Sequence, residues 1–126
     1  MNMKPRYFED VKVGEDIAPL TKEIDQVHMT IYQGATWDPH RYHYDADYVR
    51  SMGFPAPFVD GQMLGGYMCR LIGEWAGDPY AVRKLSVHYR EMLFANETIV
   101  CYGKVTRVYQ EDGLGLAECE ITISKK

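Results

Sequence analysis

Residues 61–76 read Gly61-Gln62-Met63-Leu64-Gly65-Gly66-Tyr67-Met68-Cys69-Arg70-Leu71-Ile72-Gly73-Glu74-Trp75-Ala76. The large apolar side chains recur at the three- and four-residue spacing of one helix face, and they are Leu64, Tyr67, Met68, Leu71, Ile72 and Trp75. Gly77 is expected to end this helix, since glycine readily adopts the left-handed conformation that closes one. Gly65 and Gly66 lower its helix propensity, so we expect another main chain to approach closely there.

The hydrophobic pattern changes period after this helix. Apolar and polar residues alternate over 85–91, 98–109 and 114–124, which predicts three strands. Glu111-Asp112-Gly113 is a hairpin turn signal between the last two. One long apolar helix and three long antiparallel strands predict an α+β fold, in which a curved antiparallel sheet wraps around the central helix. Such a sheet leaves a free edge, which pairing of two copies would cover.

The N-terminal half predicts shorter elements. A strand is expected near 20–24, followed by a short helix that Asp25 caps and that carries Val27, Ile31 and Ala35 on one face. Asp45 is a suitable cap for a second short helix over 46–52. With no linker and no repeat, we expect a single domain over residues 1–126.

Composition excludes several classes of function. The chain has 126 residues, of which 46% are hydrophobic and 13% aromatic, so it is expected to form one core rather than to be disordered. A net charge of −4 with scattered basic residues argues against nucleic-acid binding. The longest apolar stretch is too short and interrupted to span a membrane, and no secretion signal is expected. Three cysteines without C-x-x-C spacing indicate reduced thiols and a cytoplasmic protein.

The run from Thr36 to Asp45 carries two carboxylates, two imidazoles, a guanidinium and two phenols. Pro39 biases Asp38 away from the helical region, and the resulting turn could bring Asp38 and His43 toward one point. A carboxylate and an imidazole that share a water can make that water a nucleophile near neutral pH. The spacing fits no zinc signature, so we expect no metal here.

Three segments of the chain, 7–14, 38–45 and 58–64, together resemble the MaoC-like hydratases and dehydratases of the hot-dog fold. Their order and spacing match over nearly the whole chain. The family's usual site signature is Asp-x-Asn-Pro-x-His-x-Asp, followed downstream by His-Gly-Met. Here Thr36 stands at the usual Asp position, and Asp60-Gly61-Gln62 replaces His-Gly-Met.

Two extra residues separate Pro39 from His43, but Asp38 precedes His43 by five residues, the separation of Asp and His in the family. The His-Arg-x-His-Tyr-Asp form resembles a subgroup of the (R)-specific enoyl-CoA hydratase type. That subgroup includes mitochondrial-type 3-hydroxyacyl-thioester dehydratases and mesaconyl-CoA-type hydratases.

The resemblance implies a hydro-lyase of fatty acid metabolism that acts on acyl-CoA or acyl-carrier-protein thioesters. It would interconvert a trans-2-enoyl thioester and the (R)-3-hydroxyacyl thioester. His43 is the implied base, and Asp38 would hold the water or orient the ring. Gly61 would let the thioester carbonyl approach main-chain N–H groups at the start of the central helix, which serve as the oxyanion hole.

The resemblance also implies that Gln62 and Phe58 contact the substrate and that no cofactor is needed. Arg41 could reach a CoA phosphate or pair with a carboxylate at a subunit interface. We expect a homodimer or a higher homo-oligomer.

Two alternatives stay open. The changes at Thr36 and Asp60 are compatible with a non-catalytic hot-dog subunit that pairs with a catalytic MaoC-like partner. A hot-dog acyl-CoA thioesterase would need a carboxylate base on the central helix, and Glu74 lies at its far end.

Overall fold

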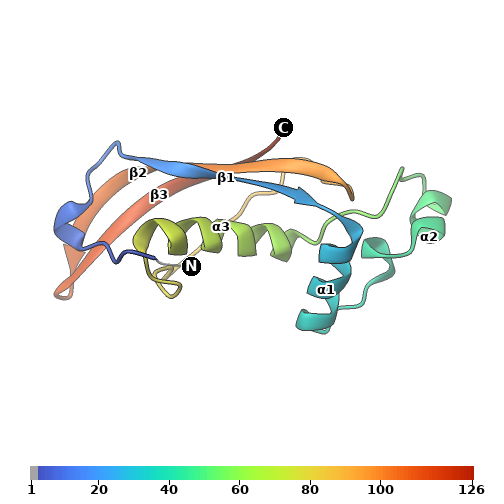
Figure 1. The fold of residues 1–126 in the computed structure, drawn as a ribbon, viewed down its shortest axis with the longest axis horizontal. Coiled ribbons are helices and arrows are strands. Elements are labelled where there is room, and N and C mark those ends of the chain that lie inside the picture. Colours follow the sequence, from blue (N-terminus) through green and yellow to red (C-terminus); the bar gives the residue numbers. More distant parts are fainter. Residues whose placement is uncertain (1–2) are drawn as a thin grey trace.

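The computed structural model describes residues 3–126. In chain order the elements are η1 (Phe8–Asp10), β1 (Asp16–Ile24), α1 (Gln26–Thr36), η2 (Arg41–His43), α2 (Ala46–Ser51), α3 (Gly61–Ala76), β2 (Glu97–Glu111) and β3 (Leu114–Lys125). The strands form one antiparallel sheet in the order β1-β2-β3. The sheet curves over α3, while α1 and α2 lie together beyond one end of that helix (Figure 1). The predicted curved sheet around one central helix is confirmed.

Helix α3 begins and ends at the predicted residues. The Asp60 side chain accepts a hydrogen bond from the Gln62 N–H at its start, and Gly77 closes it with a φ of 69°. A Cβ at Gly77 would overlap the Lys4 carbonyl oxygen, so this position requires glycine. The expectation for the two inner glycines is wrong: a Cβ at Gly66 would meet open space, and one at Gly65 only the Leu85 side chain.

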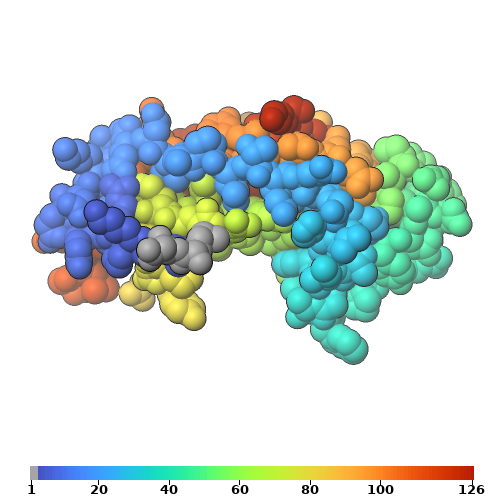
Figure 2. All heavy atoms as spheres, in the orientation of Figure 1, coloured from blue at the N-terminus to red at the C-terminus, as the bar shows by residue number. Residues whose placement is uncertain are grey.

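The core lies between α3 and the sheet, and it comprises two clusters of buried side chains. Near the start of α3 the first cluster joins the sheet to α1 and to the segment before β2, through Ile24, Met29, Val59, Met63, Leu93 and Ile99. Farther along α3 the second cluster is formed by Ile17, Leu71 and Cys101. In Figure 2 yellow-green atoms of α3 remain visible below the sheet, so this helix is partly exposed on the face shown.

The strand predicted over 85–91 is wrong. This segment belongs to no strand, and within the described chain no main-chain hydrogen bond is formed by residues 82–92. Alternation of apolar and polar residues favours an extended chain, but a strand also needs a hydrogen-bonded neighbour. No strand of residues 3–126 pairs with this segment.

Helix α1 has its predicted cap, because the Asp25 carboxylate accepts a hydrogen bond from the His28 N–H. Its predicted apolar face points outward, with Val27 65% and Ile31 64% exposed. The buried residues of this helix are Met29 and Gln33. Contacts with Ile24 and Val59 therefore fix the rotation of α1, and they bury a side that carries a polar amide.

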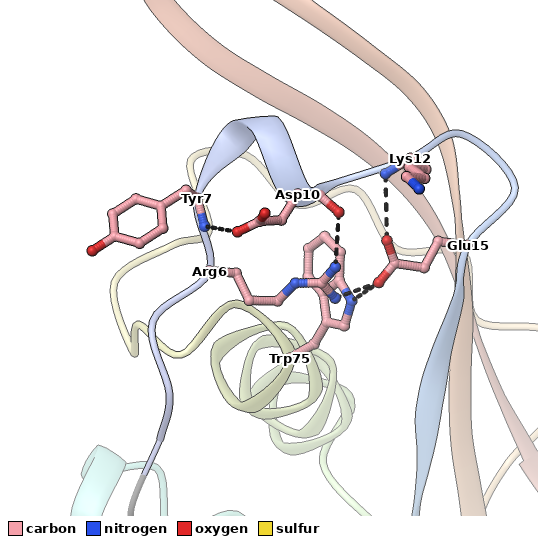
Figure 3. Close-up of polar contacts among 6 residues, drawn as sticks. All are labelled: Arg6, Tyr7, Asp10, Lys12, Glu15 and Trp75. Carbon is pink, nitrogen blue, oxygen red and sulfur yellow. Dashed lines mark hydrogen bonds and ion pairs between the residues drawn. The ribbon is translucent and has the colours of Figure 1, made fainter.

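An ion pair between Arg6 and Glu15 links the N-terminal segment to the start of β1 (Figure 3). Trp75 Nε1, near the end of α3, donates to Glu15 Oε1 at 3.1 Å. The hydrogen bond from Arg6, with smaller contributions from Trp75 and the Lys12 N–H, lowers the pKa of Glu15 from 4.5 to about 2. The carboxylate thus holds three parts of the chain together in its ionised form.

Candidate functional site

His43 lies on η2 and is buried, with 9% of its surface exposed. Its Nδ1 is 2.6 Å from the Phe58 carbonyl oxygen. Since a carbonyl oxygen can only accept, Nδ1 must carry the proton, and Nε2 of the neutral ring is left with a lone pair. The Gln26 amide donates to the His43 carbonyl at 2.7 Å. These contacts fix the position of the imidazole and its tautomer.

Aromatic rings surround this imidazole on one side. The Phe58 ring meets it edge-on at a centroid distance of 5.4 Å. The exposed His40 stacks on Tyr42 at 4.1 Å and meets the His43 ring edge-on at 6.0 Å. Its Nδ1 accepts the Tyr42 N–H at 3.3 Å. His40 therefore supports the local chain, while His43 is the buried imidazole.

Asp38 is exposed, and no hydrogen bond or ion pair joins its carboxylate to His43 in the part of the chain that the structure describes. Burial first, and then the charges of Asp60, Tyr89 and Asp38, raise the pKa of the Tyr32 phenol.

Asp60 and Gln33 form a buried polar pair at the start of α3. Asp60 is 8% and Gln33 4% exposed. Asp60 Oδ1 accepts the Gln62 N–H at 2.8 Å, and Gln33 Nε2 lies 3.5 Å from Asp60 Oδ2. Gln33 Oε1 has no partner in the described chain, which is uncommon for a buried acceptor. Sequence reasoning missed Gln33, although its helical spacing from Met29 places both residues on the same face.

Tyr89 covers Gly61. Its hydroxyl donates to the Gly61 carbonyl at 2.7 Å, and a Cβ on Gly61 would lie 2.9 Å from Tyr89 Cζ. The close approach that this glycine allows is thus made by a tyrosine ring. Among residues 3–126 the Gly61 N–H has no acceptor, whereas the Gln62 N–H is occupied by Asp60. Of these two donors only the Gly61 N–H lacks an acceptor, and the Tyr89 ring lies against the same residue.

The residues predicted to bind substrate have different surroundings. Arg41 pairs with Asp45, with both Nε and Nη2 at 3.0 Å from Oδ2, and its guanidinium lies over the Tyr48 ring. The Tyr48 N–H and then Arg41 lower the pKa of Asp45, which caps α2 as predicted. Gln62 is exposed on the first turn of α3. Of the predicted contacts, only Phe58 touches His43.

Other features of the described chain bear on the chemistry. Residues 3–126 contain no cluster of three or more His, Cys, Asp or Glu that could hold a metal ion. No helix in this range has the length and apolarity needed to cross a bilayer. The three cysteines are free, and burial raises the pKa of the Cys101 thiol to about 11. That thiol therefore stays protonated near neutral pH.

No protein-family model matches the chain, and no curated protein sequence matches it. Solved structures are similar to it. A chain of the ChsH1-ChsH2 complex from Mycobacterium tuberculosis is 23% identical with a TM-score of 0.82, and the match covers 90% of this chain and 87% of that one. The (R)-hydratase from A. caviae involved in PHA biosynthesis is 17% identical with a TM-score of 0.77, over 91% and 87% of the two chains. A MaoC-like dehydratase is 20% identical with a TM-score of 0.76, over 97% of this chain and 42% of that one. The chain therefore has the hot-dog fold of MaoC-like dehydratases and (R)-hydratases.

Proposed function

We propose that the chain is a hydro-lyase that reversibly adds water to a trans-2-enoyl thioester and forms the (R)-3-hydroxyacyl thioester. The observation that carries this proposal is the buried His43 imidazole, whose Nδ1–H is held by the Phe58 carbonyl. Its Nε2 is then available to accept a proton from water. The structural likeness to an (R)-hydratase and to a MaoC-like dehydratase supports this class of reaction.

In the proposed reaction, Nε2 of His43 removes a proton from water as the water oxygen bonds to C3 of the substrate. The electrons of the double bond move toward the thioester, and its oxygen gains negative charge. The free Gly61 N–H at the N-terminus of α3 stabilises that charge. The imidazolium then returns its proton to the α-carbon, so that one water is added in all. Asp38 would turn toward His43 and hold the water.

Substrate contacts follow from the same arrangement. The Phe58 ring beside His43 would pack against the acyl chain, and Gln62 would contact the thioester end. Tyr89 must move from Gly61 before a thioester carbonyl can reach the Gly61 N–H. Arg41, held at the surface by Asp45, would meet phosphates of CoA or of an acyl carrier protein.

The test is hydration of trans-2-enoyl-CoAs by the purified chain, followed as loss of the ultraviolet absorbance of the conjugated thioester. We expect His43→Ala to lower kcat/KM by about 10²–10⁴-fold, the usual contribution of a placed general base. His88→Ala removes an exposed imidazole that has no contact with His43 in the described chain, and it should stay within a few-fold of wild type. A folded His43→Ala enzyme with wild-type activity would contradict the assignment.

A second candidate is a subunit that needs a catalytic hot-dog partner. The contact between the Asp60 carboxylate and the Gln62 N–H favours this second candidate. The negative charge of Asp60 opposes an oxyanion at the same end of α3. The similar ChsH1-ChsH2 structure is a complex of two named components. A wild-type chain that is folded but inert with every enoyl-CoA length would favour this candidate. A thioesterase has less support, since Glu74 is paired with Arg70 at 2.7 Å.

A further inference from the structure

Helix α1 carries two glutamines whose amides contact different parts of the candidate site. The Gln26 amide, at the first residue of the helix, donates to the His43 carbonyl at 2.7 Å. About two turns farther along, Gln33 Nε2 lies 3.5 Å from Asp60 Oδ2. One helix therefore contacts both the chain that carries the imidazole and the residue that caps α3.

Packing alone does not account for an amide at position 33. Only 4% of the Gln33 surface is exposed, and its Oε1 has no partner within the described chain. Buried polar atoms are normally paired, and an apolar side chain of similar volume would avoid this unpaired acceptor. The amide must therefore have a role that an apolar residue could not fill.

The charge of Asp60 explains how the amide is oriented. An ionised carboxylate can only accept hydrogen bonds, so the NH2 group of Gln33 must face Asp60 Oδ2, and Oε1 is left without a partner. The other carboxylate oxygen, Oδ1, accepts the Gln62 N–H at 2.8 Å. Among residues 3–126, Gln33 is the only side chain that donates to Asp60. Asp60 is itself 8% exposed, so water reduces its charge only weakly.

We infer that Gln33 is a positioning residue for the proposed hydration and acts through Asp60. The inference rests on that proposed function. The positive end of the amide dipole faces Oδ2 and offsets part of the negative charge that opposes an oxyanion at the start of α3. The amide also supplies Oδ2 with a donor, so the Gly61 N–H, which has no acceptor in the described chain, stays free for the thioester oxygen.

This role predicts a loss in the chemical step rather than in substrate binding. The thioester oxygen gains negative charge only as water adds, so a less compensated Asp60 carboxylate should oppose the transition state more than the bound substrate. Gln33→Met should therefore lower kcat by at least about tenfold and leave KM within about threefold of wild type.

The test is hydration of trans-2-enoyl-CoAs by wild type, Gln33→Met, Asp60→Asn and the double variant. Asp60→Asn leaves no charge for the amide to offset, so Gln33→Met should change kcat by less than about threefold in that background. The matched control is Gln26→Met, because this second glutamine of α1 acts on the His43 carbonyl and not on Asp60. Any loss that Gln26→Met causes should be the same factor in both backgrounds.

A second variant keeps the shape of the side chain. Gln33→Glu places a carboxyl group against Asp60, and two carboxyl groups in contact hold one proton between them as the pH falls. The protonated group donates as the amide does. The kcat of Gln33→Glu relative to wild type should therefore rise at least about fivefold from about pH 8 to pH 6, whereas the ratio for Gln33→Met should stay constant.

The outcomes separate this inference from the proposed function. In an active wild type, a kcat that Gln33→Met leaves unchanged, or lowers by the same factor with and without Asp60→Asn, overturns the role of Gln33 and leaves the hydration standing. If Gln33→Met does not fold, a ratio for Gln33→Glu that stays flat with pH overturns it equally. A wild type that hydrates no enoyl-CoA overturns the proposed hydration itself, and this role with it.

Discussion

At the scale of single residues, Asp60 occupies the start of α3 with a buried carboxylate. Its carboxylate takes the Gln62 N–H and is itself approached by the Gln33 amide. His43 is anchored nearby through the Phe58 carbonyl, two positions before Asp60 in the chain. Phe58 and Asp60, two positions apart, thus hold the His43 imidazole and the Gln62 N–H, and a carboxylate at a helix N-terminus opposes further negative charge there.

Asp60→Asn should raise kcat/KM for enoyl-CoA hydration, by up to about tenfold if about 1.4 kcal/mol of repulsion is relieved. Asparagine caps a helix as well as aspartate does, so α3 should persist, with a loss of about 0.3–1 kcal/mol of helix-dipole stabilisation. The control is Asp47→Asn, in the first turn of α2, which should leave kcat/KM unchanged. A fall in activity with Asp60→Asn would instead give Asp60 a part in the reaction.

The lowered pKa of Glu15 predicts that the free energy of unfolding depends on pH. Its pKa is lowered from 4.5 to about 2 in the folded chain, so the ionised carboxylate stabilises the fold. This contribution is complete above pH 4.5 and disappears as the pH falls toward 2. Wild type should exceed Glu15→Gln in free energy of unfolding at pH 7, and the difference should vanish over this range.

Urea unfolding of both proteins at a series of pH values measures that difference. Glu9→Gln is the matched control, because Glu9 is exposed and forms no ion pair in the described chain. A gap between wild type and Glu15→Gln that stays constant from pH 7 to pH 2 would show that the carboxylate charge is not what stabilises this contact.

At the scale of elements, residues close in sequence set the two ends of α3, whereas packing against the sheet sets its position. Asp60 and Gly77 set its two ends, and each acts through atoms close in sequence. An inner glycine and the glycine that closes the helix have different surroundings, because Gly66 faces open space whereas Gly77 meets the Lys4 main chain. The same residue type therefore has opposite consequences at two positions of one helix.

Alanine at these two positions should have opposite effects on stability. Gly77→Ala should cost more than about 1 kcal/mol, since the positive φ and the overlap with Lys4 both oppose a Cβ. Gly66→Ala should stabilise the chain by roughly 0.5–1 kcal/mol through helix propensity. Chemical unfolding of both variants checks this pair, and equal effects of the two substitutions would contradict the placement of the end of α3.

At the scale of the whole molecule, the sheet is unequally supported. Strand β2 is paired on both sides, and it carries Ile99, Cys101 and Val105 with 0–1% exposure. β1 and β3 are each paired on one side, and residues 82–92 on neither. Local opening should therefore cost most free energy in β2 and least in 82–92.

Hydrogen exchange of the isolated chain should follow this order. Amides of β2 should exchange slowest, near the rate set by global unfolding, and those of 82–92 should exchange at least about a hundredfold faster. Mass spectrometry of peptic fragments resolves these segments. Protection of 82–92 equal to that of β2 in dilute monomer would show that this segment already has a strand partner within the chain.

The elements that sequence reasoning placed correctly depend on local signals. Asp25 and Asp45 cap α1 and α2 as predicted, and Asp112 and Gly113 turn the β2–β3 hairpin with φ angles of 51° and 77°. These residues act on main-chain groups a few positions away, so the order of residues alone contains the information. The change of hydrophobic period predicted a curved sheet around one helix, and the resemblance to hot-dog hydratases named that fold, which the similar structures confirm.

The sequence by itself determined the limits of α3, the hairpin and the presence of His43 in a turn, because caps, periodicity and turn residues act over short distances along the chain. Tertiary structure alone decided that α1 buries Gln33, that Tyr89 covers Gly61, and that 85–91 finds no strand partner. Each of these outcomes depends on packing and hydrogen bonding between segments far apart in sequence, and a local pattern carries no information about which distant segment lies alongside it.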